Sequence, residues 1–110
     1  RNITIVLGTS KDKDIKDMVK ILLDNDKGNT RYIASHSRHP KHTPINIIQD
    51  TFKHFGITIP GVNSIKKSIE IAKNTSEPDD LILITGSLFI AAEAREKILG
   101  ISKENYIFNS

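Results

Sequence analysis

The sequence predicts an α/β fold, a three-layer sandwich around a mainly parallel, Rossmann-like sheet. Two apolar runs, at 3–7 and 81–85, are continuous and rich in Ile and Leu, as in strands that are covered on both faces. Segments with apolar residues at helical spacing alternate with these runs, which favours parallel strands joined by right-handed helical crossovers. With 110 residues, of which 37% are hydrophobic, the chain has room for one domain and one core.

The first strand is predicted at 3–7, and a helix follows it. Asp12 or Asp14 is expected to be the N-cap of this helix, because a carboxylate accepts hydrogen bonds from the free N–H groups of the first turn. The expected buried stripe of the helix is Ile15, Met18, Val19 and Leu22. The polar stretch at 25–30, which contains a glycine, ends the helix, and a second strand is predicted at 31–35.

A second helix is predicted after Thr43, which is expected to cap it, with Pro44 at the first helical position. Its expected buried stripe is Ile45, Ile48, Phe52 and Phe55. Gly56 is expected to end this helix, and the β-branched run at 57–59 predicts a short edge strand.

The last part of the chain repeats the alternation. Ser64 is expected to cap a helix with the stripe Ile65, Ile69 and Ala72, and a polar loop at 76–80 leads into the strand at 81–85. The next predicted helix ends at Gly100, and its apolar side comprises Leu88, Ala91, Ala92, Arg95, Ile98 and Leu99. A final strand is predicted at 106–108.

Composition narrows the range of functions. Sixteen Lys and Arg residues stand against 13 Asp and Glu, and the two signs are interleaved, so the net charge of +3 is weak evidence for a polyanionic partner. A nucleic-acid-binding module is an alternative because the pI is about 9.2. However, aromatic residues make up only 5% and none interleaves with the basic run, so platforms for stacking bases are missing. The absence of Cys and of any long apolar stretch leads us to expect a cytoplasmic protein without a membrane partner.

Both apolar runs pass directly into a turn of small residues, at Gly8 and at Gly86-Ser87. In open α/β sheets ligands bind at the carboxyl ends of the strands, where a helix N-terminus offers free N–H groups to an anion. Neither turn carries a nucleotide fingerprint, since G-x-G-x-x-G is absent and Gly8 is not part of G-x-x-x-x-G-K-[ST]. The sequence therefore predicts a site for a small anionic molecule.

Three motifs in order are more specific than these turns. They are LG-x-S-x-DKDI at 7–15, SRHPK at 37–41, and an Asp pair leading into LILITGSLF-x-x-x-E-x-R at 79–95. Together they resemble the C-terminal domain of folylpolyglutamate synthase, including its bifunctional dihydrofolate synthase relatives, within the Mur ligase superfamily. The resemblance covers essentially the whole chain and is most specific at 12–15 and 85–89.

The chain departs from the family's pattern in two respects. Lys41 stands where the family commonly has Arg, which keeps the charge but loses the bidentate geometry of a guanidinium. The family's phosphate loop, its metal ligands and its Asp-x-Ala-His-Asn strand would precede Arg1. We therefore expect residues 1–110 to be a single domain from a longer ligase, without the ATP-binding domain.

The resemblance implies ATP-driven ligation, in which a folate carboxylate is phosphorylated and the amine of an incoming L-glutamate attacks it. ATP and Mg²⁺ would be held mainly by the missing N-terminal ATPase domain, so the partners implied are L-glutamate, a reduced folate, ATP and that domain. Ser87 and Gly86, at a helix N-terminus, are the expected glutamate-binding residues, together with Lys11 or Lys13. No catalytic residue is assigned. If Ser87 only caps its helix, its contribution is about 1 kcal/mol of stability.

The remaining candidates surround these residues. Asp12 and Asp14 either face the ATP and folate or serve only as caps, while Arg38, His39 and Lys41 form a basic loop that either faces the same ligands or is solvated. The evenly spaced His36, His39 and His42 do not predict a metal site, because Pro40 breaks the helix that such spacing needs and no Cys is available. A stand-alone regulatory domain that binds a small anion is the alternative to a ligase.

Overall fold

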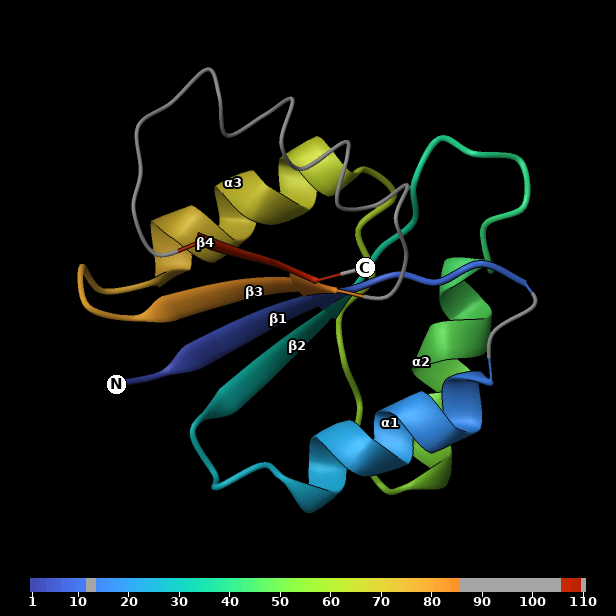
Figure 1. Cartoon of the computed structure of the whole chain (residues 1–110), viewed down its shortest axis with the longest axis horizontal. Helices are drawn as coiled ribbons and strands as arrows, with labels where there is room; N and C mark the ends of the chain where they lie inside the picture. Colours follow the sequence, from blue (N-terminus) through green and yellow to red (C-terminus); the bar gives the residue numbers. More distant parts are fainter. Residues whose placement is uncertain (12–13, 86–105, 110) are drawn as a thin grey trace.

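The protein has a parallel sheet whose strands are joined by helices, as the sequence predicted. The computed structural model describes residues 1–11, 14–85 and 106–109. Within these residues the sheet has four strands, β1 (Ile3–Leu7), β2 (Thr30–Ala34), β3 (Leu81–Thr85) and β4 (Tyr106–Asn109). They lie in the order β2-β1-β3-β4, and every neighbouring pair is parallel. Strand β2 therefore forms one edge of the described sheet (Figure 1).

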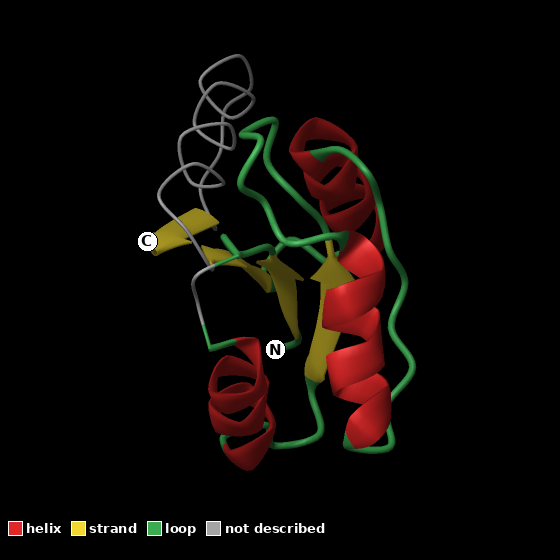
Figure 2. Cartoon of the chain, turned by 90° about the vertical axis from the view of Figure 1, so that its right-hand side faces the viewer, coloured by secondary structure: helices red, strands yellow, loops and turns green. Residues whose placement is uncertain are grey.

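Helices cover both faces of the sheet. Figure 1 shows α1 (Ile15–Asp24) and α2 (Ile45–His54) on one face and α3 (Ile65–Thr75) on the other, and in Figure 2 the strands lie between helices. Successive strand residues point to opposite faces, so Ile5 and Leu7 pack with Val19 and Phe52 on the α1 and α2 side. Val6 packs instead with the stripe of α3. This arrangement confirms the three-layer sandwich.

Two of the predicted helix caps are confirmed. Asp14, rather than Asp12, is the N-cap of α1, and its carboxylate accepts a hydrogen bond from the N–H of Asp17 at 3.1 Å. The Ser64 hydroxyl accepts from the N–H of Lys67 at 3.3 Å and so caps α3. The predicted helix with Leu88 at its start and Gly100 at its end lies outside the described residues.

The start of α2 differs from the prediction by one residue. Pro44 is the N-cap and makes no side-chain cap hydrogen bond, while Ile45 is the first helical residue. Thr43 is buried and its N–H donates to the carbonyl of Thr9 at 2.8 Å. The residue that the local sequence predicted as the cap therefore forms a hydrogen bond with another loop instead.

The edge strand predicted at 57–59 is wrong. The carbonyl of Ile59 accepts a hydrogen bond from the side chain of Gln49 on α2 at 3.1 Å, and Pro60 has no N–H to donate to a neighbouring strand. Among the described residues, this segment pairs with the edge of β2 at an isolated bridge between Ala34 and Gly61. Within the described ranges, no helix is long and apolar enough to cross a membrane.

Candidate functional site

The carboxyl ends of three strands meet at one edge of the sheet. Leu7, the last residue of β1, is paired with Ala34 of β2 and with Thr85 of β3. The N–H of Gly8 donates to the carbonyl of Thr85 at 3.2 Å, and the N–H of Ser35 donates to that of Leu7 at 2.9 Å. The connections that follow these strands therefore begin side by side, where ligands bind in open α/β sheets.

The loops after β1 and β2 are joined by backbone hydrogen bonds. We call residues 8–11 and 35–43 the paired loops. Ser10 and His42 form an antiparallel bridge, in which the N–H of Lys11 donates to the carbonyl of Lys41 at 2.9 Å. The N–H of Thr43 donates to the carbonyl of Thr9 on the other side of the bridge. Lys11 thus lies directly opposite Lys41, and both residues are exposed.

Two like charges directly opposite each other in an antiparallel pair are unfavourable. In this pair the exposed ammonium groups extend from neighbouring backbone positions, and no salt bridge joins either of them to a carboxylate of the described residues. An anion between or above them would reduce their mutual repulsion, because it attracts both charges. The arrangement is therefore suited to a carboxylate or phosphate.

Histidine rings hold the second of the paired loops in shape. The rings of His36 and His42 stack with their centroids 4.1 Å apart and an interplanar angle of 15°. Their Nδ1 atoms lie 2.8 Å from the carbonyls of Ser37 and His39 respectively, so each Nδ1 carries the proton in these contacts. The Nδ1 atom of His39 instead accepts from the N–H of Lys41 at 3.1 Å.

Of these contacts, the one with His39 holds the backbone of Lys41 in place. In the described part of the chain, no group of three or more His, Cys, Asp or Glu side chains is placed to hold a metal ion. The stack of His36 on His42 was not predicted, because it forms only when the loop folds back on itself and the even spacing of the histidines carries no signal for it.

Buried serines anchor the same loop. The Ser35 hydroxyl donates to the carbonyl of Val62 at 2.7 Å, and the Ser37 hydroxyl accepts from the N–H of His39 at 3.2 Å. Arg38 borders a cavity of about 120 Å³ beside the first residues of α3, whose lining is His36, Arg38, Asn63, Ser64, Ile65 and Lys66. Arg38 therefore faces a different part of the edge from the paired Lys11 and Lys41.

The structure brings together some of the predicted site residues and leaves others outside its described part. Lys11, His39 and Lys41 are joined through the paired loops. Asp14 is occupied as the N-cap of α1. The residues of the prediction that lie outside the described residues are Asp12, Lys13, Gly86 and Ser87.

Comparisons with known proteins bear on the fold. No family model and no curated protein sequence matches this chain. A solved structure described as bifunctional folylpolyglutamate synthase/dihydrofolate synthase from Yersinia pestis, complexed with AMPPNP and Mn ion, is similar with a TM-score of 0.76 and 14% identity. That match covers 91% of this chain and 22% of the Yersinia chain.

Two structures of folylpolyglutamate synthase from Mycobacterium tuberculosis are similar as well. One, complexed with ADP and AMPPCP, has a TM-score of 0.71 and 20% identity over 94% of this chain and 24% of its own. The other, complexed with ADP, has a TM-score of 0.67 and 15% identity over 94% of this chain and 25% of its own. This chain thus spans about a quarter of the length of each. The resemblance predicted from the motifs is confirmed in the fold: the chain folds like a segment of the folylpolyglutamate synthases.

Proposed function

We propose that the chain is the glutamate-binding C-terminal domain of an ATP-dependent ligase that adds L-glutamate to folates. The observation that carries the proposal is the pair of exposed lysines, Lys11 opposite Lys41, at the same edge at which Thr85 leads into Gly86 and Ser87. The likeness to folylpolyglutamate synthase structures supports the choice of ligand among anions. A dihydrofolate synthase activity of the parent enzyme is compatible with the same site.

The residues of this chain would bind and orient anionic groups. Lys11 or Lys13 would hold a carboxylate of the incoming glutamate, and Ser87 would add a hydroxyl and the N–H groups that follow it. Arg38, His39 and Lys41 would face the ATP phosphates or the folate carboxylates. When bound by the N-terminal domain of the parent, ATP with Mg²⁺ supplies the phosphoryl group that activates the folate carboxylate.

The charged side chains at the carboxyl ends of the described strands support this assignment of roles. Three of the exposed groups at this edge, Lys11, Arg38 and Lys41, are cations, which suit carboxylates and phosphates. Asp14 accepts a hydrogen bond from the N–H of Asp17, and in the described part of the chain no group of three or more His, Cys, Asp or Glu side chains is placed to hold a metal ion. We accordingly propose that Mg²⁺ is held by the N-terminal domain of the parent ligase.

The first test is the coding sequence upstream of Arg1. The proposal requires a phosphate-loop motif of the form G-x-x-x-x-G-K-[ST] some hundreds of residues earlier in the same reading frame. A start codon a few residues upstream, with no such motif, would contradict a ligase and favour a stand-alone anion-binding domain.

The second test is steady-state kinetics of the complete ligase with ATP, a reduced folate and L-glutamate. Lys11→Ala or Lys13→Ala is expected to raise the KM for glutamate about tenfold or more, because a hydrogen bond to a charged group contributes roughly 1.5–3 kcal/mol. Lys41→Ala is expected to raise the KM for ATP or folate, and to raise the KM for glutamate less than Lys11→Ala does, because Lys41 lies opposite Lys11.

The matched control is Lys73→Ala. Lys73 is an exposed lysine in the last turn of α3. Because a crossover helix runs antiparallel to the strands, this residue lies toward the amino ends of the strands, away from Lys11 and Lys41. Equal effects of Lys73→Ala and of the variants at positions 11, 13 and 41 would show that net charge, and not this site, determines substrate use.

A further inference from the structure

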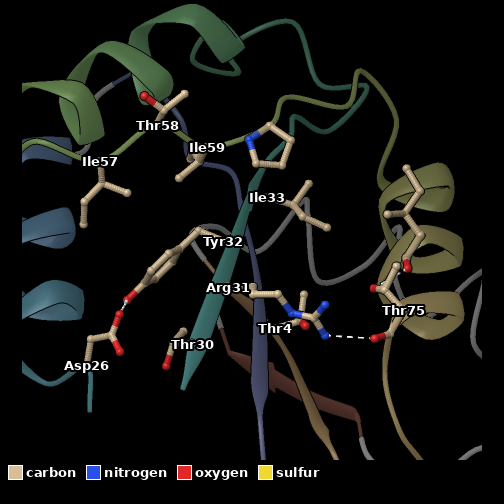
Figure 3. Close-up of a pocket in the computed structure, with 12 residues that line it drawn as sticks. Thr4, Asp26, Thr30, Arg31, Tyr32, Ile33, Ile57, Thr58, Ile59 and Thr75 are labelled. Atoms are coloured by element: carbon tan, nitrogen blue, oxygen red, sulfur yellow. Dashed lines mark hydrogen bonds between the residues drawn. The ribbon is translucent and has the colours of Figure 1, made fainter. Parts of the chain in front are cut away.

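A second cavity lies away from the paired loops, along the outer edge of β2 (Figure 3). Its volume is about 420 Å³, and its walls come from both faces of the sheet. Figure 3 shows Tyr32 and Asp26 on one side of the strand and Arg31, Thr4 and Thr75 on the other. The cavity therefore wraps around the strand edge rather than lying over one face.

The backbone of β2 is unpaired where it meets this cavity. The N–H of Ala34 donates to the carbonyl of Pro60, and the carbonyl of Ala34 accepts from the N–H of Val62, both at 2.9 Å. Ala34 thus turns its polar groups outward, whereas Ser35 turns its N–H toward Leu7 of β1. By the two-residue period of a strand, Thr30 and Tyr32 also turn their N–H and carbonyl groups outward. No described residue forms a hydrogen bond with these four groups.

The neighbouring segment cannot close this gap. Gln49 holds the carbonyl of Ile59 at 3.1 Å, and Pro60 lacks an N–H, so the segment at 57–60 stays apart from Thr30 and Tyr32. On the opposite face, the hydroxyl of Thr4 is fully buried in the cavity wall and has no partner among the described residues. Because the Thr4 hydroxyl is fully buried, an occupant of the cavity would not reach it. The unpaired N–H and carbonyl groups of the strand edge are a different case, since such an edge is a template for pairing with another chain.

The two sides of the cavity differ in charge. Exposed Arg31 donates through Nη2 to the carbonyl of Thr75 at 3.0 Å and forms no ion pair with a described carboxylate. On the other side, Tyr32 donates to Asp26 at 2.8 Å. Burial, and then this hydrogen bond, raise the pKa of Tyr32 above its usual value, so its phenol remains a donor. The Arg31 side therefore favours a negative charge, and the Tyr32 side, with partly buried Ile57, favours an apolar group.

A second copy of the chain is a poor occupant. The free edge consists of Thr30, Arg31 and Tyr32, because Ala34 is already paired with the segment at 60–62. A symmetric antiparallel dimer through three residues would place Arg31 directly opposite its own copy. Like charges at directly opposite positions destabilise such a pair.

We propose that the edge of β2 binds an extended peptide segment of another protein, with the pattern apolar-acidic-apolar, as an added strand. The acidic residue lies opposite Arg31 and shares its face, while the two apolar residues lie opposite Thr30 and Tyr32 on the other face, against Tyr32 and Ile57. The outward N–H and carbonyl groups of Thr30 and Tyr32 supply the backbone hydrogen bonds, as in other cases of β-strand addition.

The test is a titration of the chain with the synthetic peptide acetyl-Thr-Val-Glu-Val-Thr-amide, followed by backbone amide NMR and by hydrogen exchange. We expect saturable shifts at Thr30 and Tyr32 and slower exchange of the Tyr32 amide. A peptide of the same sequence with its three central amides N-methylated is expected to bind at least tenfold more weakly, because it keeps the side chains and loses the backbone donors. Equal binding of the two peptides would overturn the proposal without any change to the protein.

Charge reversal tests the role of Arg31. Arg31→Glu is expected to weaken binding of the Glu peptide at least tenfold. It is expected to strengthen binding of the same peptide with Lys in place of Glu. The matched control is Lys53→Glu, at an exposed lysine of α2 outside the cavity lining, which should leave the preference unchanged. If Arg31→Glu still binds the Glu peptide more tightly than the Lys peptide, to the same degree as the unaltered chain, the proposal is overturned. Protection of the Tyr32 amide that grows with protein concentration in the absence of peptide would also overturn it, since such protection would identify a second copy as the occupant.

Discussion

Gly61 lies between the two residues that form hydrogen bonds with the edge of β2. A Cβ atom added there would lie 2.5 Å from Cγ2 of Ile45 and 2.9 Å from Nε2 of Gln49. The same short stretch forms the bridge to Ala34 and carries the hydrogen bonds of Pro60 and Val62. The absence of a side chain at this position therefore allows α2, the segment at 60–62 and β2 to pack together.

Gly61→Ala is expected to lower the free energy of unfolding by about 1–3 kcal/mol, the usual cost of overpacking. Urea unfolding measures this as a shift of the midpoint. In a double-mutant cycle, Ile45→Ala should relieve part of the cost, because it removes the nearest methyl group. Strict additivity of the two substitutions would show that Ile45 is not the source of the clash.

Asp80 is a buried carboxylate at the amino end of β3. It accepts hydrogen bonds from the N–H groups of Asn2 and Glu77, both at 2.9 Å. These bonds, with a smaller contribution from Arg31, outweigh the opposing effect of burial and hold the pKa of Asp80 below its usual value. A carboxylate whose pKa is lower in the folded state contributes stability above its unfolded pKa and loses it as the pH falls through the folded value.

Asp80→Asn is therefore expected to lower the Tm at pH 7 and to have a smaller effect in acid. The difference in Tm between the two chains should be complete above about pH 5 and should shrink below about pH 4, where the unfolded Asp begins to bind its proton. Thermal melts between pH 2 and 7 measure it. A difference that stays constant down to pH 2 would show that the ionised form of Asp80 is not what stabilises the fold.

At the scale of the elements, sequence pattern predicted the strands and helices well where local chemistry decides them. The runs at 3–7 and 81–85 are strands with those bounds, and β2 begins one residue earlier than predicted. The predictions failed where a distant contact decides. Thr43 pairs with Thr9 instead of capping α2, and Gln49 draws the backbone at Ile59 away from the sheet.

Ser64 provides a measure of what a serine cap contributes in this chain. Ser64→Ala is expected to lower the free energy of unfolding by about 1 kcal/mol, because the N–H of Lys67 loses its acceptor, whereas Ser64→Gly should cost only a few tenths. Chemical denaturation of both variants checks this. Equal losses for Ala and Gly would show that the hydroxyl acts through packing and not as a cap.

At the scale of the whole molecule, the sequence predicted that the turns after β1 and β3 open on the same edge of the sheet but not the local geometry there. Alternating strands and helices predict parallel strands, whose carboxyl ends lie at the same edge, and in the structure the ends of β1 and β3 are neighbours. Sequence patterns carry no information on the bridge between Ser10 and His42, since it joins residues of two separate loops. The same holds for the cavity at the edge of β2, which exists because 57–59 is not a strand.

The chain by itself is expected to be inactive. It carries no G-x-x-x-x-G-K-[ST] motif, and the proposed ligase holds ATP and Mg²⁺ outside residues 1–110. A pure preparation should neither hydrolyse ATP nor add glutamate to folates at any substrate concentration. Turnover of either kind, when contaminating activity is excluded, would contradict the assignment of the domain.

The most direct test of the central claim is the KM for glutamate of Ser87→Ala and Ser87→Gly in the complete ligase. If Ser87 binds the glutamate carboxylate, both variants lose a hydrogen bond to a charged group, roughly 1.5–3 kcal/mol, and both should raise the KM for glutamate about tenfold or more while the KM for ATP stays nearly unchanged. If Ser87 is only a cap, stability should follow the pattern of the Ser64 variants, with a lower Tm for Ala and nearly normal stability for Gly. Normal glutamate kinetics in Ser87→Gly would contradict the account.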